Sequence, residues 1–326
     1  MINPRPIALV ADIGGTHARF ALANLKTLEI QNFKKLKVSD YSSLEAATES
    51  YLATLSFRPL VAGFAVAGPV GGERISLTNS SWSFTREAMR AVTATDYIAF
   101  VNDYEALAYA LPRLSENDYQ RVGGDLSAGQ ATKAVVGPGT GLGVAGLTWS
   151  RAGWCAIPGE GGHSSFAVAD DEEFMILQRM HTEFGHISAE MLISGPGLAS
   201  AYQILTELQG KQAVKCTTPE IVERALSRND PVAVKVVELF ASWLGRFAGD
   251  AALFYGARGG MYIGGGIAPR ILDVLTVGDF RKGFDSKGRM TEYMKSIPIY
   301  VIVTDEAGLR GAAAFLSIAY EVEARA

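Results

Sequence analysis

The most informative segment of the chain is Ala11–Phe20, in which an aspartate and a Gly-Gly-Thr turn separate two apolar runs. The runs Ile7–Val10 and Phe20–Ala23 predict two strands joined by a tight turn. Glycine has no Cβ, so phosphate oxygens can reach the backbone N–H groups of such a turn. An aspartate beside phosphate would repel it unless a divalent cation lay between them. The segment therefore indicates either a magnesium-nucleotide site, with Asp12 facing the metal through water, or an ordinary hairpin with a surface aspartate.

A second segment, Gly137-Pro-Gly-Thr-Gly141, repeats this pattern between the apolar runs Ala134–Val136 and Leu142–Leu147. We interpret the repeat as a structural duplication, with one phosphate-binding hairpin in each of two domains. Coincidence is the alternative, because the chain has 35 glycines. The glycines from Gly141 to Gly146 also match the dinucleotide fingerprint GxGxxG, but no helix follows them, as that motif requires.

Asn102 and Asp103 follow the predicted buried strand Tyr97–Val101 and precede a predicted helix, Tyr104–Leu111. The carboxyl ends of strands are where α/β folds bind their ligands. An aspartate there can accept a proton from a substrate hydroxyl that attacks a phosphoryl group. The alternative is that Asp103 only caps the helix that follows it.

Glu160 and His163 lie in the glycine-rich segment Gly159–His163, which we expect to be a loop. The Glu-x-x-His spacing occurs in metal sites, but those need a helix and a second copy of the motif, and the sequence offers neither. A carboxylate and an imidazole are well suited to bind sugar hydroxyls. Glu190 adds another carboxylate shortly before Leu192–Gly197. For each of these residues alone, the alternative is a solvated loop side chain.

Composition indicates a large folded protein. The chain has 326 residues, enough for two domains at roughly 150 residues each. Hydrophobic residues make up 48% and charged residues 20%, and the net charge is −4 without a basic block, which argues against nucleic acid as a partner. Cys155 and Cys216 form no CxxC pair, so neither a disulfide framework nor a Cys-rich zinc site is expected. No signal peptide or membrane span is recognisable, and a cytoplasmic protein is expected.

Strand and helix signals alternate along the chain, which favours an α/β fold. We predict a small α/β domain over residues 1–113, completed by the C-terminal helix 307–326, and a large α/β domain over residues 114–306. The polar, glycine-containing stretch after Arg113 is the predicted boundary. The clearest helix starts at Asp230-Pro231 and is closed by Gly256 after Tyr255.

Seven motifs follow one another with suitable spacing, and together they are far more specific than any one alone. They are Asp12-Ile-Gly-Gly-Thr-His-Ala-Arg19, Thr78-Asn79-Ser-Ser-Trp82, Asn102-Asp103-Tyr-Glu-Ala106, Gly137-Pro-Gly-Thr-Gly-Leu-Gly143, Pro158-Gly-Glu-Gly-Gly-His163, Ser188-Ala-Glu190 with Leu192-Ile-Ser-Gly-Pro-Gly197, and Gly264-Gly-Gly-Ile-Ala-Pro-Arg270. From about residue 7 to residue 315, the chain resembles the bacterial-type ATP-dependent glucokinases of the hexokinase/actin superfamily.

The resemblance implies a two-domain, actin-like ATPase (ribonuclease H-like) fold with nucleotide and sugar in an interdomain cleft. It implies that Asp103 is the catalytic base on the sugar 6-hydroxyl, and that Asn102, Asp103, Glu160, His163 and Glu190 bind the sugar. The residues implied to hold ATP phosphates are Ala11, Asp12, Ile13, Gly14, Gly15 and Thr16 in the first turn, and Gly139, Thr140 and Gly141 in the second. His17 departs from the pattern, because a small polar residue such as Asn is expected after Gly-Gly-Thr.

We therefore expect a glucokinase that uses ATP and Mg²⁺ to phosphorylate the 6-hydroxyl of D-glucose, giving glucose 6-phosphate and ADP at the first step of glucose use in glycolysis. A homodimer is expected. A kinase for another hexose, mannose or fructose, is the nearer alternative. The farther one is a non-catalytic sugar-binding regulator on the same scaffold, a class that usually carries an additional N-terminal DNA-binding segment.

Overall fold

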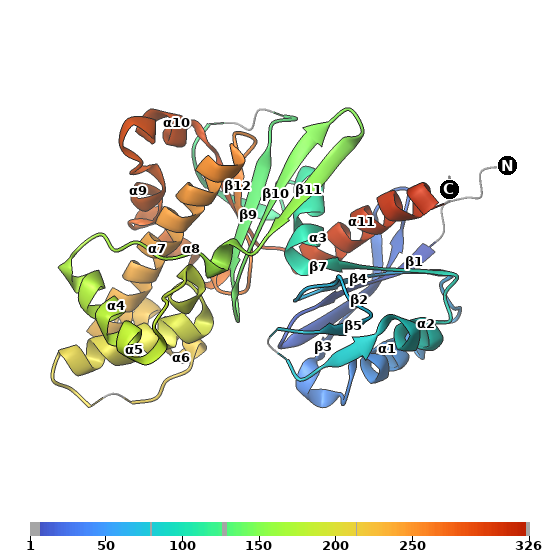
Figure 1. The fold of residues 1–326 in the computed structure, drawn as a ribbon, viewed down its shortest axis with the longest axis horizontal. Helices are drawn as coiled ribbons and strands as arrows, with labels where there is room; N and C mark the ends of the chain where they lie inside the picture. The colour runs from blue at the N-terminus through green and yellow to red at the C-terminus, as the bar shows by residue number, and fades with distance from the viewer. Residues whose placement is uncertain (1–6, 79, 126–128, 213, 324–326) are drawn as a thin grey trace. The chain divides into compact units, whose positions relative to one another are not determined.

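The computed structural model describes residues 7–78, 80–125, 129–212 and 214–323 (Figure 1). Contacts within the chain divide it into two units. The first consists of Met1–Asp118, Gly153–Pro158 and Thr304–Ala326, and the second of Tyr119–Ala152 and Gly159–Val303, as far as their residues are described. The first unit thus holds residues 114–118, 153–158 and 304–306 in addition to the ranges predicted for the small domain.

The first unit is built on a five-stranded mixed sheet in the order β3-β2-β1-β4-β7. β1 pairs antiparallel with β2 and parallel with β4, and β4 is parallel to β7. All six residues of β4 are buried, as expected for a central strand covered on both faces. The strands are β1 (Ile7–Ile13), β2 (His17–Asn24), β3 (Ile30–Lys37), β4 (Val61–Val66) and β7 (Tyr97–Asn102).

Helices cover both faces of this sheet, and the helix from the end of the chain is one of them. α11 (Ala307–Glu323) packs Leu309 and Leu316 against Ala8 and Val10 of β1. Figure 1 shows this helix, in red, lying along the blue strands of the first unit. The remaining elements are α1 (Leu44–Leu52), α2 (Arg86–Thr93), α3 (Asp103–Ala110) and the small hairpin β5 (Arg74–Ser76) with β6 (Ser83–Thr85).

The second unit repeats this strand arrangement. Its sheet contains β10-β9-β12-β13-β8 in that order, with β9 antiparallel to β10 and parallel to β12, and β12 parallel to β13. An antiparallel hairpin followed by two parallel strands is the same order as β2-β1-β4-β7, so the predicted duplication of the hairpin is confirmed. The strands are β8 (Tyr119–Gly123), β9 (Lys133–Pro138), β10 (Leu142–Ser150), β12 (Met261–Ile263) and β13 (Ile299–Ile302); β11 spans Gly153–Gly159.

The second unit contains the longest described helix, α7 (Pro231–Tyr255). The carboxylate of Asp230 caps its first turn, and Gly256 closes it with a left-handed backbone (φ 63°), as the sequence predicts. The other helices are α4 (Asp171–Phe184), α5 (Gly195–Leu208), α6 (Thr218–Leu226), α8 (Leu272–Val277), α9 (Phe280–Asp285) and α10 (Thr291–Ser296).

The structure refines two expectations. The stretch after Arg113, predicted as the domain boundary, contains both the division between the units, at Asp118 and Tyr119, and the strand β8, which pairs with β13. The Gly159–His163 segment is not all loop, since Gly161–His163 makes a single 3₁₀ turn. Asn79, part of one family motif, lies outside the described residues. Among the helices that the structure describes, none is long and apolar enough to cross a membrane.

Candidate active site

The first predicted phosphate turn connects β1 and β2. Asp12 lies one residue before the end of β1, and the turn is closed by a hydrogen bond from the Gly14 N–H to the His17 carbonyl at 3.0 Å. Gly14 and Gly15 are partly exposed and Thr16 is exposed. The turn therefore presents backbone to solvent next to a carboxylate.

Ala11 and Ile13, also predicted to hold phosphate, are fully buried in the apolar core. Because side chains alternate along a strand, Asp12 between them points to the opposite face. Any contact of Ala11 and Ile13 with a nucleotide is confined to their backbone.

The Asp12 carboxylate is paired with Arg19, its register partner on β2, at 3.3 Å. Burial raises the pKa of the Asp12 carboxyl, and the positive charge of Arg19 opposes that rise. The side chain remains 19% exposed. Mg²⁺ in kinases is usually held by one or two carboxylates together with substrate phosphates, so an accessible carboxylate beside an open backbone turn fits that ion.

Asn102 and Asp103 lie at the start of α3 and have different positions in it. The Asn102 side chain is the cap, since its Oδ1 accepts the N–H groups of Tyr104 at 2.9 Å and Glu105 at 3.2 Å. Asp103 is the first helical residue, and its Oδ1 accepts the Tyr104 N–H at 3.0 Å. The alternative in which Asp103 is the helix cap is therefore wrong, because Asn102 fills that role.

The negative charges of Asp12 and Asp103 both influence the pKa of the Tyr104 hydroxyl. Burial raises the pKa of Tyr104, and the negative charges of Asp103 and Asp12 raise it further. β1, β4 and β7 are parallel neighbours, with Asp12 level with Ala65, so the two carboxylates leave the same end of the sheet. The first unit thus brings the predicted metal-facing and base residues to one edge.

The second predicted phosphate turn, Gly139–Gly141, connects β9 and β10. Its Gly139 carbonyl accepts the N–H of Gly195 at the start of α5 at 2.8 Å, and a Cβ on Gly139 would meet no atom within 4 Å. Thr140 is exposed. Gly265 packs so closely on the Pro138 carbonyl that no Cβ fits there, and its φ of 77° also favours glycine.

Glu190 and the turn that carries His163 both contact Leu142, the first residue of β10. Glu190 Oε2 accepts the Leu142 N–H at 2.8 Å. The 3₁₀ turn that follows Glu160 packs Gly162 against the Leu142 carbonyl, where a side chain would clash, and the side chains of Glu160 and His163 are exposed. Since Leu142 directly follows Gly141, these contacts lie beside the second predicted phosphate turn.

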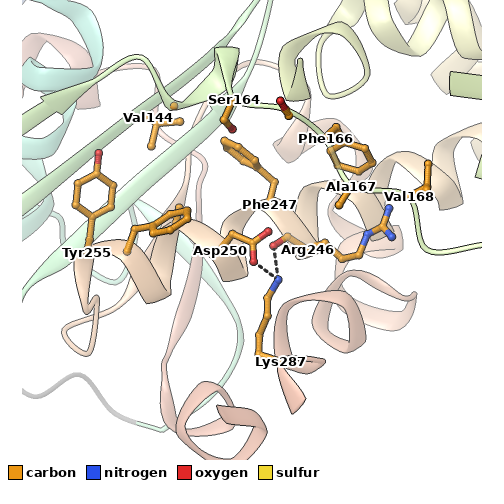
Figure 2. Close-up of a pocket in the computed structure, with 14 residues that line it drawn as sticks. Val144, Ser164, Phe166, Ala167, Val168, Arg246, Phe247, Asp250, Tyr255 and Lys287 are labelled. Carbon is orange, nitrogen blue, oxygen red and sulfur yellow. Dashed lines mark hydrogen bonds and ion pairs between the residues drawn. The ribbon is translucent and has the colours of Figure 1, made fainter. Parts of the chain in front are cut away.

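The same unit has a pocket of about 520 Å³ beside the predicted sugar-binding turn. Gly161 is among the residues that line it, and Val144, Phe166 and Phe247 contribute apolar surface (Figure 2). Lys287 donates to the Arg246 carbonyl at 3.0 Å and pairs with Asp250. None of the five predicted sugar-binding residues lines this pocket.

The predicted site residues thus form two groups, each inside one unit. Asp12, Asn102 and Asp103 belong to the first unit, and Glu160, His163 and Glu190 to the second. Within the described ranges, no three His, Cys, Asp or Glu side chains are grouped so that they could hold a metal ion.

Sequence reasoning gave no role to Arg19, although the residue lies in the first motif. The sequence could have indicated its pairing with Asp12, because a hairpin that turns at Gly14–Thr16 sets Arg19 opposite Asp12. Arg19 also pairs with Asp305, which no local pattern links to the hairpin.

Comparison with known proteins identifies the family. The sequence model of the glucokinase family matches residues 9–319. The chain is 42% identical to a glucokinase of Neisseria meningitidis serogroup C over 309 residues, 94% of either chain, and 38% identical to a glucokinase of Tolumonas auensis over 94% of this chain and 96% of that one.

Comparison with solved structures supports the same family. A glucokinase from an Antarctic psychrotroph superposes with a TM-score of 0.82 at 36% identity, covering 96% of this chain and 98% of that one. A ROK family glucokinase from Streptomyces griseus, solved with glucose and AMPPNP, shares the fold at a TM-score of 0.64 and 18% identity, with 95% and 98% covered. The two mixed sheets are thus those of a two-domain sugar kinase, and the chain belongs to the glucokinase family.

Proposed function

We propose that this protein transfers the γ-phosphoryl group of ATP to the 6-hydroxyl of D-glucose, giving glucose 6-phosphate and ADP. Membership of the glucokinase family supports the reaction. The observation that carries the mechanism is the start of α3, where Asn102 caps the helix and Asp103 stands next to it as a partly buried carboxylate.

Asp103 is the general base of the proposal. As the 6-oxygen attacks the γ-phosphorus, its proton passes to the Asp103 carboxylate, and the bond from that phosphorus to the bridging oxygen of ADP breaks. Phosphoryl transfer needs little covalent chemistry from the protein beyond this, because positioning and charge neutralisation lower most of the barrier.

Asn102, Glu160, His163 and Glu190 are the proposed partners of the sugar hydroxyls. The Asn102 Oδ1 is already used by the helix cap, so this residue offers its amide N–H groups, one of which reaches the Gly68 carbonyl at 3.4 Å. Glu190 has one oxygen on the Leu142 N–H and a second one for a sugar hydroxyl.

The two glycine turns are the proposed phosphate sites, through the backbone of Gly14–Thr16 and of Gly139–Gly141. Mg²⁺, bound with ATP near Asp12, would neutralise charge on the phosphate oxygens. Arg19 pairs with the Asp12 carboxylate, and its positive charge opposes the rise in the pKa of Asp12 that burial causes.

We also propose that the protein acts in the cytoplasm as a homodimer. Phe254 and Val277 of the second unit are both 87% exposed, and a second subunit that covered them would remove this apolar surface from water. Light scattering of the purified protein tests the dimer by its mass.

The reaction is tested by measuring ADP release with glucose, mannose and fructose as acceptors. Consumption of ATP that depends on glucose, with one glucose 6-phosphate formed for each ADP, supports the proposal. A stronger response to mannose or fructose would assign another hexose, and binding of sugar without turnover would indicate a regulator.

A further inference from the structure

The first turn of α11 lies against the carboxylate of Asp12. At this point of contact the helix carries Gly308. A Cβ built on Gly308 would lie 2.6 Å from both Cγ and Oδ2 of Asp12, and 3.2 Å from its Cβ. Side-chain carbons are not found closer than 3.0 Å to such atoms, so Asp12 in this conformation requires glycine at position 308.

The backbone of Asp12 has little freedom to move away. β1 is hydrogen-bonded to β2 on one side and to β4 on the other, and Asp12 is in register with Arg19 and Ala65. Only rotation of its short side chain could relieve a contact with α11. A methyl group at position 308 would therefore displace the carboxylate rather than the strand.

Ion pairs fix the start of α11 over this row of the sheet. Asp12, Arg19 and Lys35 are register neighbours across β1, β2 and β3. Asp305, two residues before α11, bridges the two cations, with Arg19 at 3.2 Å and Lys35 at 2.9 Å. Arg19 thus holds Asp12 and Asp305 together, and Gly308 follows within a single helical turn.

From this geometry we propose that Gly308 is a positioning residue for the metal-facing carboxylate of Asp12. The missing side chain lets α11 and Arg19 hold that carboxylate from two sides in one orientation. The inference rests on the proposed function, in which Asp12 faces the magnesium of bound ATP. Partners that orient a metal-facing group typically change metal affinity about 10- to 100-fold when altered.

The test measures the gain in nucleotide affinity that Mg²⁺ provides, without turnover. Affinity for AMPPNP is titrated calorimetrically in excess Mg²⁺ and again in EDTA, and the ratio of the two dissociation constants is compared between variants. Gly308→Ala is expected to lower this ratio about tenfold, with little change in the affinity measured in EDTA. A ratio within twofold of the unmodified protein would overturn the proposal.

Gly63→Ala is the matched control. Gly63 lies on β4 and faces the same helix, where a Cβ would come 3.0 Å from the Leu316 side chain. This variant also crowds α11, but Gly63 is in register with Val10 and its Cβ would meet Leu316 instead of Asp12, so its magnesium ratio should stay unchanged. An equal fall in both variants would mean that general displacement of α11, and not the Asp12 contact, causes the effect.

The double variant Asp12→Ala/Gly308→Ala covers the case in which Gly308→Ala does not fold. Removing the Asp12 carboxylate removes both 2.6 Å contacts. The double variant should fold and should show the same magnesium ratio as Asp12→Ala alone. Failure of the double variant to fold while Asp12→Ala folds would overturn the proposal. If the unmodified protein gains no affinity from Mg²⁺, the proposed nucleotide site itself fails, which is a separate result.

Discussion

At the residue scale, the neighbouring polar residues Asn102 and Asp103 have separable roles. The amide oxygen of Asn102 accepts two N–H groups at the start of α3, and Asp103 Oδ1 shares the one from Tyr104. A carboxylate at the first helical position is also stabilised by the helix dipole. Because Asn102 is the cap, the proposed base Asp103 can be replaced without removing the cap of the helix.

Asp103→Asn is expected to lower kcat by about 10²- to 10⁴-fold, the usual effect of losing a general base. The fold and glucose binding should persist, because Asn102 still caps α3. Steady-state kinetics and glucose titration of the same preparation check both parts. A variant that retains more than about a tenth of the turnover would remove Asp103 from the role of base.

Glu160→Gln, His163→Ala and Glu190→Gln are each expected to weaken glucose binding by about 1–3 kcal/mol, the cost of leaving a hydroxyl of the bound, buried sugar without its partner. AMPPNP binding should change far less. Glu190→Gln should also preserve the fold, since an amide oxygen can still accept the Leu142 N–H. Separate titrations with glucose and with AMPPNP measure the two affinities. An equal loss of affinity for both ligands would show that these residues are misassigned.

The sequence singled out Asp12 and Asp103 because each lies at the end of an apolar strand, and Glu160, His163 and Glu190 because they lie in or beside glycine-containing motifs. It could not locate the contact between Gly308 and Asp12. That contact depends on Asp305 pairing with Arg19, which is 286 residues away in the chain. Long-range ion pairs leave no local pattern in one sequence.

At the element scale, capping signals predicted the long helices better than strand signals predicted the short strands. α7 was predictable because Asp230-Pro231 and Gly256 mark both of its ends. β8 was not, because none of its residues is fully buried and its pairing with the buried β13 makes it a strand. Edge strands of this kind carry little alternation of apolar and polar residues for a sequence to show.

Asp230→Ala is expected to lower the free energy of unfolding by about 1–3 kcal/mol. The carboxylate accepts the N–H groups of Val232 and Ala233 and the Tyr202 hydroxyl, the last at 2.7 Å. Chemical denaturation at neutral pH measures the change. An effect below about 0.3 kcal/mol would mean that water replaces these bonds without loss.

The charge of Asp230 also predicts a pH dependence. Burial would raise its pKa, but hydrogen bonds from Tyr202, Ala233 and Val232 and the charge of Arg224 bring it below the ordinary 3.8. A folded-state pKa below the unfolded value stabilises the protein above pH 3.8, and this contribution is lost as the pH falls through the folded pKa. Asp230→Asn should therefore be destabilising at neutral pH and progressively less so below pH 3.8. A difference that does not shrink there would contradict the assignment.

At the scale of the whole molecule, the two units share one strand arrangement but differ in the residues at their hairpins. The hairpin β1–β2 carries a carboxylate before its turn, whereas β9–β10 carries none and is backed by the start of α5. The sequence predicted this duplication because both hairpins have a glycine turn between apolar runs. The proposed roles are divided in the same way, with Asp12, Asn102 and Asp103 in one unit and Glu160, His163 and Glu190 in the other.

The central claim is that the chain phosphorylates the 6-hydroxyl of glucose with ATP and that Asp103 is the base. The most direct measurement follows ADP release and identifies the sugar product for the unmodified protein and Asp103→Asn, with glucose, mannose and fructose compared at equal concentration. The unmodified protein is expected to release ADP only when glucose is present and to form one glucose 6-phosphate for each ADP. Its rates with mannose and fructose should be lower, and Asp103→Asn should lose turnover. ATP consumption that is independent of glucose, or an Asp103→Asn variant as active as the unmodified protein, would contradict it.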